Sequence, residues 1–133
     1  MTLIVGDGCL TKQDVDAINA GLGASSMQIQ STLTALSVNG AIDPHTAKTY
    51  IITKAGVLAD TLAAPTTTTD DGTLITILSG TANAHTVTAT GLFQDGAGHV
   101  NLATFGSSAG AALILMAYQA KWIVISTQNV TMS

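Results

Sequence analysis

Three histidines, one cysteine and eight acidic residues are the side chains with which this chain could perform acid–base, nucleophilic or metal chemistry. The histidines are His45, His85 and His99, and no HExxH or CxxC pattern accompanies them. Zinc sites are usually built from such closely spaced ligands. The spacing therefore favours a polar strand or turn position for each histidine. It leaves open a metal bound by three copies of one histidine on a symmetry axis.

The other candidates for catalysis are equally isolated. Cys9 has no neighbouring base or cation that would activate its thiol. Asp70 and Asp71 are adjacent, and adjacent side chains diverge in a strand or turn. The glycines at 6–8 and 21–23 match neither a P-loop nor a dinucleotide-binding motif. We expect no enzymatic activity, no metal and no cofactor; a hydrolase that uses distant aspartates remains the alternative.

Charge is scarce in this chain and excludes one class of partner. Charged residues make up 9% of the sequence, against roughly 25% in a typical soluble protein. All four cations are lysines, so the chain cannot make the bidentate arginine contacts that read guanine or neutralise a run of phosphates. We expect no nucleic-acid partner. Because permanent interfaces are depleted in charge, the composition favours a homo-oligomer over a monomer.

Cysteine content and hydropathy place the chain in a reducing compartment. A single cysteine cannot form an internal disulfide. The N-terminal residues carry no basic stretch, which argues against a signal peptide. The longest apolar run, at 109–118, falls short of the about 20 residues that a membrane helix needs. We expect a protein made in the cytoplasm with no membrane partner.

Two regions differ in the structure that their residues predict. Residues 1–40 read as an N-terminal arm for docking or oligomerisation, with a short helix that begins at a Thr11 cap and ends at Gly21. The stretch 25–38 fits neither period cleanly, and we expect part of it to be extended. Residues 41–133 read as a β-domain.

Short strands separated by turns account for this second region. The pattern predicts a mainly β fold, a small antiparallel β-sandwich or barrel. Tyr118–Lys121 is predicted as a tight hairpin link, and Trp122 as a core or interface anchor. Both faces of 73–79 are largely apolar, which predicts a strand buried on two sides. The strands are expected at 49–53, 61–65, 73–79, 85–90, 99–105, 111–118 and 122–126.

The order of these segments resembles a known family. TLAAP at 61–65 leads into DGTLITI at 71–77, followed by HTVTA at 85–89 and a Gly/Asp turn. The chain then continues with ATF at 103–105, AALILMAY at 111–118 and KWIVIS at 121–126. Over residues 48–127 this pattern resembles the small β-domain of tailed-bacteriophage virion proteins: head decoration (cement) proteins, head fibres and some tail fibres.

The resemblance implies a structural role and a trimer. A decoration protein of this kind binds the major capsid protein on the outside of an assembled head as a homotrimer, after synthesis in the bacterial cytoplasm. The alternative is a head or tail fibre module that adheres to the host surface through the loops around 93–100. For capsid docking we expect Thr2, Leu3, Ile4, Val5 and Leu10 of the arm. For the trimer interface or core we expect Ile75, Ile77, Leu113, Leu115, Trp122 and Val124.

Overall fold

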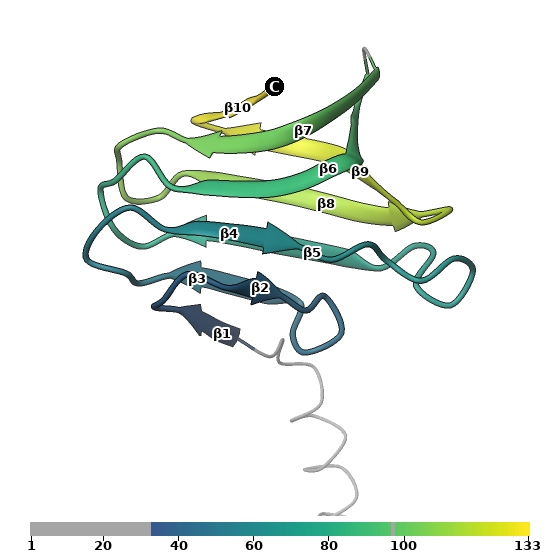
Figure 1. Cartoon of the computed structure of the whole chain (residues 1–133), viewed down its shortest axis with the longest axis horizontal. Helices are drawn as coiled ribbons and strands as arrows, with labels where there is room; N and C mark the ends of the chain where they lie inside the picture. Colours follow the sequence, from purple (N-terminus) through teal and green to yellow (C-terminus); the bar gives the residue numbers. More distant parts are fainter. Residues whose placement is uncertain (1–32, 97) are drawn as a thin grey trace, which may run out of the picture. The chain divides into compact units, whose positions relative to one another are not determined.

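The described part of the chain is built from strands alone. The computed structural model describes residues 33–96 and 98–133, which form ten strands and no helix (Figure 1). This confirms the mainly β fold predicted from the sequence. The strands are β1 (Leu33–Leu36), β2 (Ala41–Ile42), β3 (Thr49–Ile52), β4 (Ala59–Leu62), β5 (Leu74–Ser79), β6 (Thr86–Asp95), β7 (Gly98–Phe105), β8 (Ala112–Tyr118), β9 (Lys121–Gln128) and β10 (Val130–Met132).

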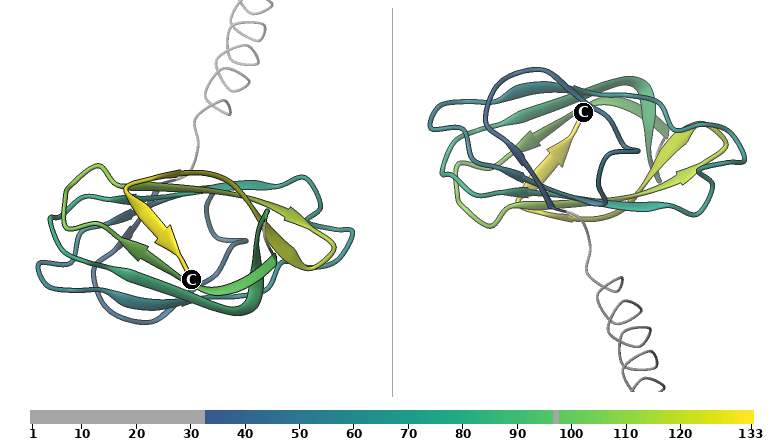
Figure 2. Two further views of the ribbon diagram at one scale, coloured as in Figure 1. Left: turned by 90° about the horizontal axis from the view of Figure 1, so that it is seen from above. Right: turned by 90° about the horizontal axis from the view of Figure 1, so that it is seen from below.

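One curled sheet folds over on itself to make two facing layers, which Figure 2 shows from both ends. The first layer has the order β1-β3-β5-β8-β9, and the second has β2-β4-β6-β7-β10. The layers join where β9 pairs with the second half of β6, through Phe93 with Trp122 and Gln94 with Ile123. The register of β6 shifts between Thr88 and Phe93, so this strand leaves β4 and reaches β9.

Among the first six strands, each pairs in parallel with the next strand but one, an arrangement that the sequence analysis did not predict. Odd-numbered β1, β3 and β5 pair in parallel in one layer, and even-numbered β2, β4 and β6 do so in the other. The prediction of an antiparallel sandwich is therefore wrong for this half. It holds for the pairs β5–β8, β8–β9, β6–β7 and β7–β10. Each of the first five connections crosses from one layer to the other instead of closing a hairpin, so consecutive strands lie in different layers.

Strand positions agree well with the sequence pattern after residue 48. All seven predicted strands are present, shifted by a few residues at their ends. Strand β1 lies within the ambiguous stretch 25–38 and confirms that part of it is extended. The helix expected from Thr11 lies outside the described residues, and so does the capsid-docking segment 2–10. The unit that contains all ten strands begins at Thr32.

The core lies between the two layers, where alternate side chains of every long strand meet. In β8, for example, Leu113, Leu115 and Ala117 are buried while the residues between them face outward. Of the six residues predicted for the trimer interface or core, five are fully buried here and Val124 packs against them partly exposed. The fully buried ones are Ile75, Ile77, Leu113, Leu115 and Trp122.

Two buried aromatic side chains with polar groups tie the loops to this core. The Trp122 indole donates to the Ala63 carbonyl at 2.9 Å, which confirms its anchoring role in the core. The Tyr50 hydroxyl donates to the Asp43 carbonyl and accepts from the Ala47 N–H at 3.2 Å. Burial raises the pKa of Tyr50, so the phenol stays protonated and keeps both hydrogen bonds.

Candidate functional site

The outward face of the β1-β3-β5-β8-β9 layer carries apolar side chains on all five strands, with Thr49, Thr76, Ser126 and Gln128 between them. Leu74, Met116 and Ile123 are successive cross-strand partners, so they form one continuous row. Leu74 and Ile125 are about half exposed, at 53% and 51%. The prediction that 73–79 is buried on two sides is thus wrong for the single chain. We call this surface the aliphatic face: Leu33, Ala35, Ile51, Leu74, Leu78, Ala112, Ile114, Met116, Ile123 and Ile125.

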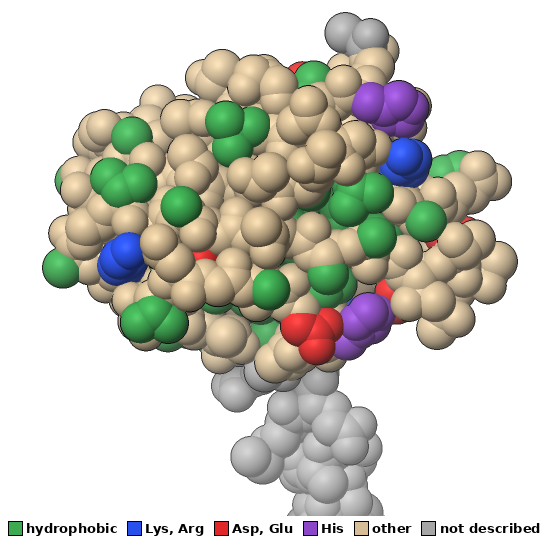
Figure 3. Space-filling view, in the orientation of Figure 1, with side chains coloured by type: hydrophobic (Ala, Val, Ile, Leu, Met, Phe, Trp, Pro, Cys, Tyr) green, Lys and Arg blue, Asp and Glu red, His purple; other side chains and the backbone are tan. Residues whose placement is uncertain are grey.

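The outward face of the other layer is chemically different. Its cross-strand rows bring Thr86 beside Thr104, Thr104 beside Thr131, and Thr61 beside Thr88. Figure 3 shows this face, which is mostly tan, with apolar side chains dispersed over it and few charged ones. Threonine is a good strand former and needs no partner for its hydroxyl at the surface. The two faces of the molecule are therefore suited to different surroundings, the threonine face to water and the aliphatic face to another apolar surface.

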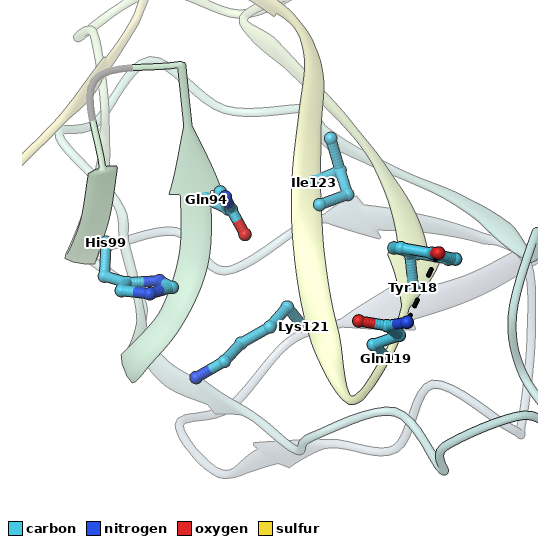
Figure 4. A pocket seen from close by; sticks show the side chains of 6 residues that line it. All are labelled: Gln94, His99, Tyr118, Gln119, Lys121 and Ile123. Carbon is cyan, nitrogen blue, oxygen red and sulfur yellow. Dashed lines mark hydrogen bonds between the residues drawn. The ribbon is translucent and has the colours of Figure 1, made fainter.

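A pocket of about 530 Å³ opens where the layers join. It lies between the β6–β7 and β8–β9 hairpins, whose strands meet through the β6–β9 pairing. Figure 4 shows its lining side chains around the outer side of β6 and β9. The lining offers two carboxamides, an imidazole, an ammonium, a phenol and one aliphatic side chain. These belong to Gln94, His99, Tyr118, Gln119, Lys121 and Ile123.

The pocket holds the one exposed aromatic ring of the chain. The sequence has five aromatic residues, and four of them are at most 1% exposed. Tyr118 is the fifth and is 49% exposed. Gln119 Nε2 donates to the Tyr118 hydroxyl at 3.3 Å, and Lys121 Nζ donates to the Gly91 carbonyl at 2.8 Å. These contacts fix the phenol and the ammonium at the two sides of the pocket.

A strained turn carries one wall of the pocket. Tyr118–Lys121 forms the predicted tight hairpin, and Gln119 and Ala120 both have positive φ, at 49° and 60°. Two-residue hairpin turns of this hand favour Asn-Gly, because residues with larger side chains are strained there. The Gln119 N–H donates to Asp71 Oδ1 at 2.8 Å, which helps to hold the turn. Strained residues that persist often mark functional positions.

His85 is a structural histidine. It is fully buried, and its Nδ1 accepts from the Leu58 N–H at 3.0 Å. Its Nε2 therefore carries the proton and lies 2.9 Å from Thr81 Oγ1. Thr81 Oγ1 in turn donates to the Lys54 carbonyl at 2.8 Å. His85 lies directly before β6, and the sequence did not indicate its burial.

His45 links two loops at the surface. Its Nδ1 lies 2.9 Å from Asp43 Oδ1 and its Nε2 lies 2.7 Å from Asp70 Oδ2. The hydrogen bond to Asp70, and next the one to Asp43, raises the pKa of His45 above its ordinary 6.5. The Thr66 N–H lowers the pKa of Asp70, and the His45 N–H lowers that of Asp43. Asp71 turns away to Gln119, so the two adjacent carboxylates diverge as predicted.

A further carboxylate, Asp60, is buried in β4. It is 4% exposed and accepts from the Gly40 N–H at 2.7 Å. Desolvation raises the pKa of Asp60. Its hydrogen bond ties the chain before β2 to the second layer, so this carboxylate acts in the fold.

The described residues assemble no metal or catalytic cluster. Between 33 and 133, apart from residue 97, no three His, Cys, Asp or Glu side chains are arranged to hold a metal ion. In the same ranges no helix has the length and apolar character needed to cross a bilayer. Cys9 and the docking residues Thr2, Leu3, Ile4, Val5 and Leu10 lie outside these ranges.

Sequence reasoning located one side of the pocket and missed the other. The loops around 93–100 were the predicted surface of the fibre alternative, and they supply Gln94 and His99. The partners from 118–123 could not be identified, because β6 and β9 are not neighbours in sequence. The excess of apolar residues on both sides of 73–79 was the signal for the aliphatic face.

Searches against models of protein families and against curated proteins found no match.

Proposed function

We propose that this protein is a structural virion protein: a decoration protein that binds the outside of an assembled bacteriophage head as a homotrimer and stabilises it. The observation that carries the proposal is the aliphatic face. A surface that spans five strands with one lysine at its margin is costly to leave in water. The resemblance of residues 48–127 to phage virion β-domains supplies the class of particle.

Copies of this chain are the partner that best fits the aliphatic face. Five strands at about 4.8 Å spacing and about 17–20 Å length give a flat area of roughly 400–500 Å². One partner of a standard interface contributes about 800 Å², so the apolar centre covers about half of it and leaves room for a polar rim. The face presents no charge pattern for a charged partner to match, and in a closed trimer one part of this apolar face would pack against a different part of the same face on the next copy around the axis.

Binding to the assembled head would stabilise it by linkage. A ligand that binds only the lattice stabilises each site by about 2.7 kcal/mol when its concentration is about a hundredfold above Kd. The same contact repeats over the symmetric shell. The predicted docking segment 2–10 would make this contact with the head, and the two-layered β-domain would be the body that this segment attaches.

Co-sedimentation tests the proposal directly. The full chain is mixed with undecorated phage heads and pelleted, and light scattering gives the mass of the free protein. We expect saturable binding by a species of three chains, and heads that withstand higher temperature. Deletion of residues 2–10 should leave the trimer intact and abolish pelleting. A free protein of one chain that ignores heads would overturn the proposal.

The second candidate is a fibre module that adheres to the host surface. The pocket favours it, since its lining is polar, holds an exposed aromatic ring and includes the predicted loop region. Retention on host cells without binding to heads would favour this candidate over decoration.

A further inference from the structure

We propose that the pocket between the β6–β7 and β8–β9 hairpins binds a saccharide that carries a carboxylate. This inference depends on neither candidate function above, because its observations concern the side chains of a single chain. It rests on four features of the described residues: the shape of the pocket, its single exposed ring, its amides and its charge.

The pocket has the size and the rigid base of a ligand site. Its volume of about 530 Å³ falls within the about 300–1,000 Å³ of small-molecule sites. Beneath it, Phe93 and Trp122 are paired neighbours and are both fully buried. The outward residues beside them, Gln94 and Ile123, therefore project from a fixed base. A site on rigid strands can hold a ligand in one orientation.

Tyr118 provides the surface on which a sugar ring can lie. A sugar presents an apolar face of C–H groups edged by hydroxyls, and an exposed aromatic ring covers the first while polar groups bind the second. The four other aromatic rings of the chain are buried in the core. The fold therefore had room to bury apolar rings, and it leaves this one half exposed beside polar side chains.

Two carboxamides in the lining supply hydroxyl recognition. Gln119 projects from the hairpin turn beside the Tyr118 ring, and Gln94 projects from β6 on the other side of β9 (Figure 4). Each amide offers both a donor and an acceptor, as a vicinal pair of hydroxyls requires. Gln119 already donates to the Tyr118 hydroxyl, which leaves its Oε1 to accept. Gln119 occupies this position despite the strain of its positive φ.

The charge of the lining selects an acidic sugar. Lys121 contributes an ammonium held by the Gly91 carbonyl, and its remaining N–H groups can donate to a ligand. His99 adds an imidazole, and the lining includes no carboxylate. The nearest carboxylate identified by a contact, Asp71, is engaged by the Gln119 N–H in the turn. An anionic group of the ligand would thus meet the Lys121 ammonium and no carboxylate among the lining side chains.

Solution NMR with three probes tests this inference. Sodium glucuronate, glucose and sodium acetate are titrated separately into the ¹⁵N-labelled full chain. We expect glucuronate to shift the amides of residues 94, 99 and 118–123, glucose to shift the same amides with weaker affinity, and acetate to shift none of them. Glucose that binds as tightly as glucuronate would overturn the carboxylate assignment. Absence of localised shifts, or equal shifts with acetate, would overturn the saccharide site.

Variants separate the role of each side chain. Tyr118→Ala should weaken binding of both sugars about tenfold, as expected for loss of one ring contact, and Tyr118→Phe should retain most of the affinity. Lys121→Met should remove the preference for glucuronate over glucose. Thr88→Ala on the threonine face is the matched control and should change nothing. Glucuronate binding that survives Tyr118→Ala unchanged would contradict the assignment.

Discussion

Met116→Lys should dissociate the homo-oligomer without unfolding the chain. Met116 lies in the aliphatic face, between its cross-strand partners Leu74 and Ile123. Its side chain points outward, opposite to the buried Leu115 and Ala117. A lysine at this position can extend into water in the free subunit. In the assembled protein the same ammonium would be trapped against apolar side chains.

The expected effect is large because each contact is repeated by symmetry. Removal of a buried methionine costs about 2 kcal/mol of apolar burial, which weakens one contact about 30-fold. A closed trimer has three such contacts, so the total is about 6 kcal/mol before the desolvation of the ammonium is added. A trimer of ordinary affinity would then dissociate at micromolar concentrations.

Light scattering coupled to size exclusion measures the change. Thr88→Lys, on the threonine face, adds the same charge and serves as the matched control; it should keep the mass of three chains. Trp122 is the single tryptophan and is buried, so its emission reports whether each variant remains folded. A Met116→Lys protein with unchanged mass would refute the role of the aliphatic face. Dissociation by Thr88→Lys instead would place the interface on the opposite layer.

Three further predictions concern the stability of the fold. Gly80→Ala should destabilise the fold by about 1–3 kcal/mol, because a Cβ there would lie 2.7 Å from a β3 carbonyl oxygen. Urea unfolding compares this variant with Gly56→Ala, whose Cβ would meet nothing within 4 Å. Equal destabilisation by the two variants would contradict the prediction. Ala120→Gly should raise the free energy of unfolding by about 0.5–1 kcal/mol, since the strain at its positive φ exceeds the added flexibility of the unfolded chain; a lower urea midpoint would argue against strain. Because the pKa of His45 is raised, its stabilising contribution is complete below pH 6.5 and is lost as pH rises through the higher folded pKa. The pKa values of Asp43 and Asp70 are lowered, so the stabilising contribution of these carboxylates is lost as pH falls below 3.8. NMR titration of His45 should give a pKa above 6.5, and His45→Gln should remove the loss of stability at alkaline pH; an NMR pKa at or below 6.5 would contradict the two hydrogen bonds.

Local pattern determined what the sequence could reveal of this fold. Strands β5 and β8 have strict alternation over six and seven residues, and their positions follow from that alternation. Strand β2 has two residues, too few for any period. The parallel winding was hidden for another reason: alternation determines which face of a strand is buried and gives no information about which strand lies beside it.

The same limit applies to the pocket and to the aliphatic face. Gln94 and Ile123 face one another only because β6 bends at its register shift and reaches β9. No local signal near either residue encodes that pairing. The aliphatic face was encoded, since 73–79 is apolar on both sides, but the sequence could not tell burial by the same chain from burial by another. The structure separates them, because Ile75 and Ile77 lie in the core while Leu74 and Leu78 remain outside.

The two surfaces are adjacent and yet chemically separable. Ile123 belongs to both, since it pairs with Met116 in the aliphatic face and lines the pocket beside Gln94. An interface with an apolar centre and a polar rim would place the pocket at that rim. All six lining side chains of the pocket belong to the described part of one chain. Because Ile123 is shared, an interface on the aliphatic face would border the ligand site, and assembly would change the surroundings of the pocket.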